Sequence, residues 1–414
     1  MTQLFRNGLM LPSGGPATVS PDPAPALTEE AALGPGFPPD FRIDLLVAEG
    51  DTVAQGQPVA TDRRAPDLTL TAPMGGRIAR IDTGPGRALS RILFFRDPAA
   101  GRHAFRTDGD VAALMLATGL WTGFRRRPFG GFPAPGTRPA ALVVMAHDTR
   151  PGALPPKVAL KGAEDDFARG LTALATLTDG PVLLVQPPGP ALADAPRLRV
   201  IHAGPLHPQG LAGTHVHAHF PAAPDRPVWD IAAQEVAALG ELIRTGHLPE
   251  TRMIAVGGPA ATGGRVVRCQ PGADLHGLAQ PVMRPGGAAI LSGSSLDGIE
   301  SRFLWLRDRQ VTVMPRPPAP GQPHWFRAAL ARMSRPAPII PTAALDHALP
   351  RSMPVMPFLR ALSAGDDETA QSLDVLSLLE EDLALADYVT AADPALAATL
   401  RGMLDRIASE GGHA

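Results

Sequence analysis

Hydrophobic and polar residues alternate in short runs between residues 41 and 96, and glycines separate these runs. The segment Leu68–Ala72 has apolar residues at every second position, and the stretches around 42–47 and 77–81 have similar lengths. Alternation with a period of two is typical of a strand that buries one face, and closely spaced turn residues leave no room for helices. The pattern therefore predicts a small β domain.

The pattern changes between residues 139 and 256. Continuous apolar runs predict buried strands at 140–145, 181–185, 198–201 and 252–256. Helical spacing of apolar residues predicts two helices, one through Phe167 and Leu171 and one that Asp230 would cap and Gly246 would close. Strands that alternate with helices favour an α/β layer with a mostly parallel sheet.

The rest of the chain divides at its proline-rich segment. Residues 257–315 return to strands separated by glycines, and residues from 354 onward read as helices. Asp393-Pro394 would begin a last helix with one apolar stripe of Leu396, Leu400, Met403 and Ile407. The predicted parts are a β domain at 1–100, an α/β domain at 101–256, a β module at 257–315, a connector at 316–353 and a helical region at 354–414.

Composition excludes several kinds of chemistry. Cys269 is the only cysteine, which rules out an intramolecular disulfide, a cysteine-ligated iron–sulfur cluster and a thiolate zinc site within the chain. Lys157 and Lys161 are the only lysines, so Schiff-base or acyl-lysine chemistry has few possible positions. The net charge of −2 gives no overall attraction for nucleic acid. No signal peptide or run long enough to span a bilayer is evident, and we expect a cytoplasmic protein.

Three histidines, His215, His217 and His219, alternate with other residues. On a strand this spacing would place all three imidazoles on one face, as in some catalytic metal sites. No Asp or Glu lies within the run to act as a fourth ligand or to orient the rings. Ordinary polar residues at a sheet edge are therefore the favoured interpretation, and we predict no metal.

A glycine-rich segment, 256–264, follows a predicted strand and suggests a nucleotide loop. Gly258 and Gly263 have the spacing of a phosphate-binding loop, but Gly264 stands where the phosphate-binding lysine should be. A strand-like run follows, where such a loop would need a helix. A turn at a domain boundary is favoured.

Aromatic residues and arginines are concentrated at 119–133 in a chain with only 5% aromatic residues. Such a cluster can hold an anion or stack on a planar ring, although a charged run can equally be a solvated surface. We regard the cluster as a quinone- or partner-binding candidate, and predict no catalytic residue. Its members are Trp121, Phe124, Arg125, Arg127, Phe129 and Phe132.

The N-terminal β domain resembles the lipoyl and biotinyl carrier domains, whose modified lysine lies at a hairpin tip. The matching tip, 62–67, contains two arginines and no lysine. A guanidinium cannot form the amide that attaches lipoate or biotin, so the resemblance implies a scaffold without a swinging arm.

Several long motifs give a second resemblance that covers nearly the whole chain. They are Gly119-Leu-Trp-Thr-Gly-Phe-Arg-Arg-Arg-Pro-Phe129, Met145-Ala-His-Asp-Thr149, Glu164-Asp-Asp-Phe167, His207-Pro-Gln-Gly-Leu-Ala-Gly-Thr-His-Val-His217 and Glu380-Glu-Asp-Leu-Ala-Leu385. In these the chain resembles the NqrA family of the Na⁺-translocating NADH:quinone oxidoreductase. The resemblance implies an α/β multidomain fold: a barrel-sandwich hybrid, an α/β parallel-sheet domain, a β-grasp module of the soluble-ligand-binding kind, and C-terminal helices.

The same resemblance implies a function. The chain would be a peripheral subunit on the cytoplasmic face of the inner membrane, in a translocase that oxidises NADH, reduces ubiquinone to ubiquinol and exports Na⁺. NADH, FAD, FMN and Fe–S centres would belong to the partner subunits B to F, and this subunit would be structural or associated with ubiquinone. Two departures concern the tail: Ala386 and Thr390 stand where the family commonly has cysteines, and Ala392-Asp-Pro-Ala replaces a Lys-Tyr-x-x-Gly turn.

The family is also similar to flavin-binding subunits such as the Rnf C subunit, which hold FMN on a loop Gly-x-Gly-Gly-Ala-Gly-Phe-Pro. At that place this chain has 122–133, in which bulky side chains would fill the space that glycines leave for the phosphate. The flavin site is therefore interpreted as lost. The alternatives are a stand-alone flavin-dependent NADH oxidoreductase that retains the pocket and a metal enzyme that uses the three histidines.

Overall fold

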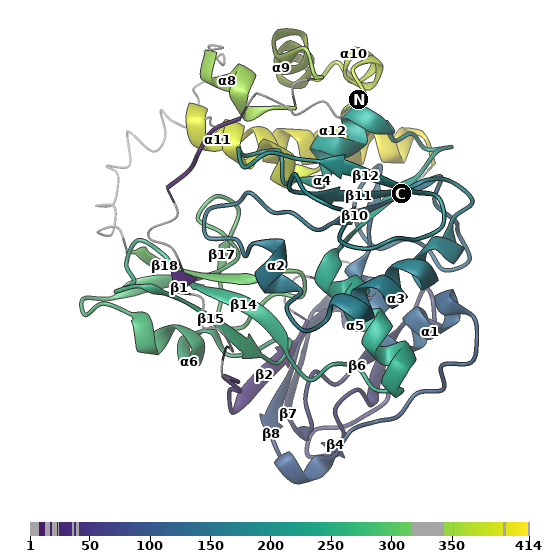
Figure 1. Cartoon of the computed structure of the whole chain (residues 1–414), viewed down its shortest axis with the longest axis vertical. Coiled ribbons are helices and arrows are strands. Elements are labelled where there is room, and N and C mark those ends of the chain that lie inside the picture. Colours follow the sequence, from purple (N-terminus) through teal and green to yellow (C-terminus); the bar gives the residue numbers. More distant parts are fainter. Residues whose placement is uncertain are drawn as a thin grey trace.

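The structure is a computed structural model. It describes residues 8–12, 17–18, 23, 25–34, 37–38, 41–316, 343–350, 352–391 and 395–412. Most of the expected connector and the Asp393-Pro394 helix start lie outside the described residues. Figure 1 shows β-sheets at one end of the molecule, an α/β layer in the middle and the C-terminal helices at the other end.

The N-terminal unit is built from two β-sheets, as its alternating pattern predicts. One has the order β2 (Glu30–Leu33), β8 (Leu89–Arg96), β7 (Gly76–Thr83) and β4 (Thr52–Val53), and the other β3 (Ile43–Leu45), β5 (Pro58–Asp62) and β6 (Thr69–Thr71). Short 3₁₀ turns η1 (Pro85–Arg87) and η2 (Pro98–Ala100) flank β8. Ile78, Phe94 and Leu70 are buried between the sheets. The expected tip at 62–67 lies in the β5–β6 hairpin.

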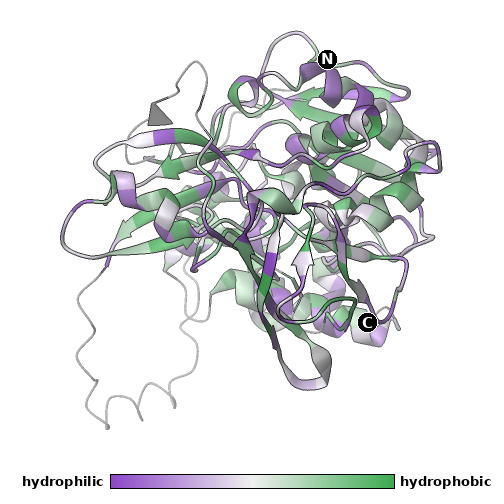
Figure 2. Cartoon of the chain, turned by 90° about the horizontal axis from the view of Figure 1, so that it is seen from below, coloured by the Kyte–Doolittle hydropathy of each residue, from purple (hydrophilic) through white to green (hydrophobic). Residues whose placement is uncertain are grey.

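The central unit is a five-stranded sheet, with the order β12 (Leu198–His202), β11 (Val182–Gln186), β10 (Ala141–Met145), β13 (Val228–Ala232) and β9 (Arg125–Arg127). The first four strands are parallel and β9 is antiparallel to β13, so the predicted mostly parallel sheet is confirmed. Helix α1 (Val111–Thr118) and the turn η3 (Leu120–Gly123) precede this sheet. The central strands β10, β11 and β13 are largely hydrophobic and buried (Figure 2 colours the chain by hydropathy). The edge strand β12 is at most half-buried, so the prediction of a buried strand at 198–201 is wrong in its burial.

Helices cover both faces of this sheet. On one face, Leu142 and Val144 of β10 pack in a core with α3 (Glu164–Leu174) and α5 (Ala233–Thr245), and the turn η4 (Ala175–Leu177) and the short helix α2 (Pro156–Ala159) adjoin α3. On the other face, Val143 packs with Val216 of α4 (Ala212–His219). Glycines let α3 and α5 approach closely, since a Cβ at Gly170 would lie 1.9 Å from the Val236 carbonyl oxygen.

The third unit is a six-stranded mixed sheet with the order β1 (Ala17–Thr18), β15 (Gly264–Cys269), β14 (Arg252–Gly257), β18 (Gln310–Pro315), β16 (Ala288–Ser292) and β17 (Ile299–Glu300). Helix α6 (Leu275–Ala279) and the turn η5 (Gln280–Val282) pack on it. The predicted strand at 252–256 therefore belongs here and not to the α/β sheet, because β14 forms a hairpin with β15. The glycine-rich segment 256–264 lies at that hairpin, and no helix follows it.

The C-terminal unit consists of helices, as the sequence predicts. They are α8 (Ala343–Ala348), α9 (Val355–Ala364), α10 (Asp367–Ser372), α11 (Ala384–Thr390) and α12 (Leu396–Glu410), with turns η6 (Val375–Ser377) and η7 (Glu380–Leu383). The predicted stripe of α12 is buried in a separate core. No helix among the described residues is both long and apolar enough to span a bilayer.

Two local predictions are wrong. The three histidines lie on helix α4 and not on a strand, so His217 points away from the other two. Asp230 does not cap α5: it lies within β13, the helix begins after Ala232, and the Asp230 side chain is buried beside arginines. Gly246 does close α5, in the left-handed conformation that favours glycine.

Candidate functional site

The topology of the central sheet marks one edge as the place for a ligand. From β10 the chain runs outward to β11 and β12 and then returns to β13 on the other side of β10. Ligands of open α/β sheets bind where the strand order reverses, outside the carboxyl ends of the strands. Here that point lies between β10 and β13.

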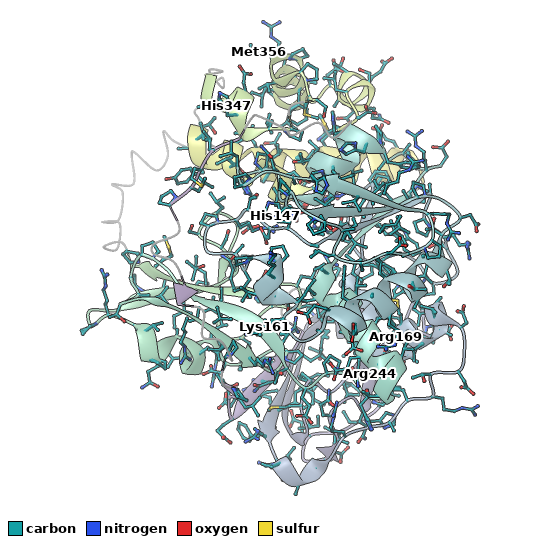
Figure 3. All side chains as sticks on the ribbon, in the orientation of Figure 1. His147, Lys161, Arg169, Arg244, His347 and Met356 are labelled. Carbon is teal, nitrogen blue, oxygen red and sulfur yellow. The ribbon has the colours of Figure 1, made fainter. Side chains whose placement is uncertain are left out.

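A cavity of about 870 Å³ lies at this switch point. Met145, His147 and Asp148 line it after β10, and Ala232 and Ala233 line it where β13 leads into α5. Its other walls come from the third unit around 293–297 and 305–310 and from the C-terminal unit around 379–388. Figure 3 labels His147, which lies near the middle of the molecule. Phe37 and Pro38 of the N-terminal unit also line it, so residues from all four units enclose one pocket.

Strand β9 places the predicted arginines at the boundary between the sheet and the C-terminal unit. The Arg127 side chain is fully buried. Its guanidinium donates to Asp230 (3.1 Å), Asp382 (3.0 Å) and Glu381 (3.1 Å), and also to the Ser377 carbonyl (3.1 Å). A buried charge is tolerated only when it is paired and hydrogen-bonded, and each of these contacts contributes to that condition.

Arg125 extends the same cluster to the cavity wall. It lines the switch-point cavity, donates to Asp230 at 3.1 Å and forms an ion pair with Glu381. Burial opposes ionisation of Asp230, but Arg125 and Arg127 outweigh it and hold the pKa of that carboxyl below its usual value. For Asp382 burial prevails and raises the pKa to about 6. Neither arginine is part of a solvated surface.

Helix α4 completes the cluster with a glycine. A Cβ at Gly213 would lie 2.1 Å from a carboxylate oxygen of Asp382. That carboxylate also accepts a hydrogen bond from the Leu379 amide at 2.9 Å, so it has little freedom to move. The motifs at 119–129, 207–217 and 380–385 thus meet in space. Together they fix the C-terminal unit on the central sheet.

The predicted aromatic residues separate into three environments. Trp121 and Phe124 are buried in the core, where their ring centroids lie 5.4 and 5.3 Å from that of Trp229. Phe129 is half-buried against the C-terminal core. Phe132 is half-buried near Phe37, at a ring-centroid distance of 5.6 Å. Of the six candidate residues, only Arg125 lines the switch-point cavity.

The Phe132 ring also makes a cation–π contact with an arginine. The Arg307 guanidinium lies over it at 5.3 Å and donates to the Phe124 carbonyl oxygen at 2.9 Å. Arg307 lines the cavity, and burial, followed by repulsion from Arg125, lowers its pKa to about 10. A planar ring stacked by an arginine beside a cavity is an arrangement that suits recognition of planar or anionic groups.

Two further acidic residues of the third unit line the cavity. The Arg150 guanidinium donates a hydrogen bond to Asp297 at 2.6 Å and another to Asp148 at 3.0 Å. Asp308 accepts from the Ser292 hydroxyl at 2.5 Å, and burial raises its pKa to about 6. The contact between Arg150 and Asp297 joins the loop after β10 to the third unit. The cavity wall therefore combines apolar surface with ion-paired side chains.

The histidines are structural in this arrangement. His215 Nε2 contacts the Gln209 carbonyl at 2.7 Å, whereas His217 contacts Ser352 and Leu373 of the C-terminal unit. The rings of His215 and His219 stack at 6.0 Å. Within the described part of the chain, no group of three or more His, Cys, Asp or Glu residues could hold a metal ion.

Sequence reasoning found the arginine segment but missed its partners. Glu381, Asp382 and Asp230 are far from it in sequence, and the available signal was only that the motifs at 119–129 and 380–385 belong to one family pattern. The cavity itself was also missed. Its walls come from all four units, so no single segment encodes it.

The fold and the site together define a class: a multidomain protein in which a barrel-sandwich hybrid precedes an α/β unit with a pocket at its switch point. The family model described as NqrA N-terminal barrel-sandwich hybrid domain matches residues 4–96, and the one described as NqrA second alpha/beta domain matches residues 106–248. Both expected folds are confirmed.

Named relatives match almost the whole chain. The A subunit of the Na(+)-translocating NADH-quinone reductase from Yersinia pseudotuberculosis serotype O:1b is 32% identical over 446 residues, covering 98% of this chain and 99% of the relative. The protein of the same name from Klebsiella pneumoniae is 34% identical over 443 residues, with the same coverage. The chain belongs to the NqrA family of Na⁺-translocating NADH-quinone reductases.

Among solved structures, an NAD⁺-reducing [NiFe]-hydrogenase in the air-oxidized state aligns with a TM-score of 0.38 and 14% identity over 74% of this chain and 62% of that chain. This likeness is too low to support a structural argument.

Proposed function

We propose that the chain is a peripheral subunit of a membrane complex that oxidises NADH, reduces ubiquinone to ubiquinol and exports Na⁺. The observation that carries the proposal is the match to NqrA relatives over 98% of the chain. The partners would be subunits B to F, and the chain would lie on the cytoplasmic face of the inner membrane. Co-isolation of these subunits with a tagged chain would test the proposal, and isolation of the chain alone from detergent-treated native membranes would count against it.

We infer that the chain holds no redox cofactor of its own. The support lies at the segment that corresponds to the flavin loop of related subunits. Arg125 and Arg127 fill this segment, and both side chains form ion pairs with Asp230 and Glu381. A flavin phosphate would therefore have to displace buried ion pairs. The partner subunits would then carry the electron-transferring groups.

A stand-alone flavin oxidoreductase is the second candidate. It is favoured by one observation: the switch-point cavity of about 870 Å³ is large enough for a cofactor. The absorption spectrum of the purified chain distinguishes the two candidates. Our proposal expects no flavin band near about 450 nm, whereas a stoichiometric band would favour the second candidate.

We also propose that the region 257–315 is a β-grasp module of the soluble-ligand-binding kind. Its mixed sheet with α6 packed against one face supports this assignment. The proposed domain limits are 1–100, 316–353 and 354–414 as expected, but the expected limit between 101–256 and 257–315 moves to residue 251, because β14 pairs with β15 in the sheet of the module.

Within the assembled complex we propose that the aromatic and arginine segment contributes to a quinone or partner surface. Arg125 lines the cavity, and Phe132 lies under the Arg307 guanidinium, which lines it as well. The other four candidates would stabilise the position of this segment without lining the cavity; they are Trp121, Phe124, Arg127 and Phe129.

A photoreactive quinone analogue tests that surface. Labelling of this chain in the isolated complex should fall in a Phe132→Ala variant. Phe95→Ala is the matched control, because Phe95 is also a partly exposed phenylalanine, with the Arg77 guanidinium over its ring at 5.9 Å, on the distant strand β8. Equal labelling of the two variants would exclude a quinone contact at Phe132.

A further inference from the structure

A second cavity, of about 290 Å³, lies where the first three units meet. Its walls come from the end of β6, from the outer face of α5, from the loop between α2 and α3, and from β14 and β15. Its volume is near the lower limit for small-molecule sites, about 300 Å³. It adjoins the switch-point cavity through a common wall that includes Glu235 and Arg309.

Most of the lining of this junction cavity is apolar. The N-terminal unit contributes Leu33 and Leu70, helix α5 contributes Ala237 and Ala238, and Met253 of β14 lies opposite. Small alanines on α5 leave the space open, since larger residues there would fill it. Such a lining would bury the hydrocarbon part of a ligand, and each buried methylene contributes favourably to binding.

The polar residues in the same lining are mainly cationic. Positive charge comes from Lys161, Arg252, Arg268 and Arg309, and negative charge from Glu235 and Glu241. Glu235 forms an ion pair with Arg309 and lies 3.8 Å from Arg252, so one carboxylate faces two of the four cations. The wall thus has more positive than negative charge, in a recess where low-dielectric surroundings strengthen an electrostatic attraction.

Glu241 is the second acidic residue of the lining. Burial, followed by repulsion from Asp166, raises the pKa of the Glu241 carboxyl. Asp166 is itself held by Arg169 of α3 at 2.5 Å and by Arg244 of α5 at 2.8 Å (Figure 3). These two arginines are therefore occupied on the helix surface and do not line the cavity.

We propose that the junction cavity binds a small amphipathic carboxylate. Its hydrocarbon chain would lie against the apolar wall, and its carboxylate would lie toward the cationic residues, with Lys161 on the loop between α2 and α3 among them (Figure 3). Because three units form the walls, the ligand would bridge all of them. This cavity is distinct from the switch-point cavity, with which it shares the wall that includes Glu235 and Arg309.

Octanoate is a suitable probe, and the two lysines supply a matched pair. Lys157 and Lys161 are the only lysines, both are exposed, and only Lys161 lines the cavity. Isothermal titration of the full chain should give saturable octanoate binding that weakens about tenfold in Lys161→Glu, as expected for loss of one charged contact. Lys157→Glu changes the net charge equally and should bind octanoate as the unaltered chain does.

Two further measurements keep the proposal open to refutation. Octanol and octylamine should bind far more weakly than octanoate, and Ala238→Phe should abolish binding by filling the cavity. Lysine modification by pyridoxal phosphate and borohydride should be reduced by octanoate at Lys161 and not at Lys157, as read by peptide mass spectrometry. Equal binding by the two lysine variants, equal binding of octanol, or protection of neither lysine would overturn the proposal.

Discussion

Replacing Arg127 with methionine tests whether the buried ion cluster holds the C-terminal unit on the sheet. The substitution removes three contacts to carboxylates and leaves Asp382 without its buried ion-pair partner, whereas Glu381 and Asp230 keep Arg125. Removal of one member of a buried ion pair typically costs about 3–5 kcal/mol. If opening of the C-terminal unit exposes these carboxylates, its opening free energy should fall by that amount, which is roughly a 100-fold or greater loss of protection against hydrogen exchange.

Hydrogen exchange with peptide resolution is the appropriate assay, because it separates opening of one unit from global unfolding. Protection should fall in α11 and α12 and persist in β7 and β8, which belong to another sheet. Arg126→Met is the control: Arg126 is on the same strand, and among the described residues its side chain donates to the Gly130 carbonyl and to no carboxylate. Equal loss of protection in the two variants would refute the role assigned to the cluster.

Adding Asp382→Leu to Arg127→Met gives a second check. In the double variant no unpaired carboxylate is buried at position 382, so part of the protection that Arg127→Met loses should return. If the loss of protection in the double variant equals the sum of the losses in Arg127→Met and Asp382→Leu alone, the two side chains do not depend on each other.

Three further predictions concern stability and reactivity. Burial lowers the pKa values of His207 and His215 to about 4, below the usual 6.5; the unfolded chain therefore binds protons first, and stability should fall between about pH 6.5 and pH 4 by up to roughly 3 kcal/mol for each ring. Urea unfolding across this range measures the loss, which a His207→Gln variant should reduce. Gly213→Ala should lower the thermal midpoint because its Cβ would clash with Asp382, whereas Gly109→Ala, in open space, should not. Burial raises the pKa of the Cys269 thiol to about 12, so a thiol reagent should modify it only after unfolding, and rapid modification of the native chain would contradict the structure.

The sequence predicts those elements whose signal is local. The α12 stripe and the alternating strands of the N-terminal unit bury the residues that their periodicity marks. In both cases one face packs on one core, so the pattern and the burial agree.

The errors arise where distant contacts decide. The segment 212–219 has alternating histidines and only one large apolar residue, Val216, and it forms a helix because that residue packs on the sheet. Asp230 lies close before a helix, where a cap is plausible, but the arginines of β9 need its charge inside the sheet. The 252–256 strand has the apolar character of an α/β strand, and only its hairpin with β15 assigns it to another sheet.

Part of the candidate site could be predicted from the sequence, because part of its signal is local. The composition of 119–133 marked the segment as unusual, and the buried cluster explains two of its three consecutive arginines, Arg125 and Arg127. That cluster could not be derived from spacing, since its carboxylates come from β13 and from η7.

The most direct test of the proposed function is the Na⁺-stimulated NADH:quinone reductase activity of native membranes that lack this chain. The activity should be absent without the chain and should return when the unaltered chain is supplied, with no flavin bound to the chain itself. Full activity in membranes without the chain would contradict its assignment to the complex.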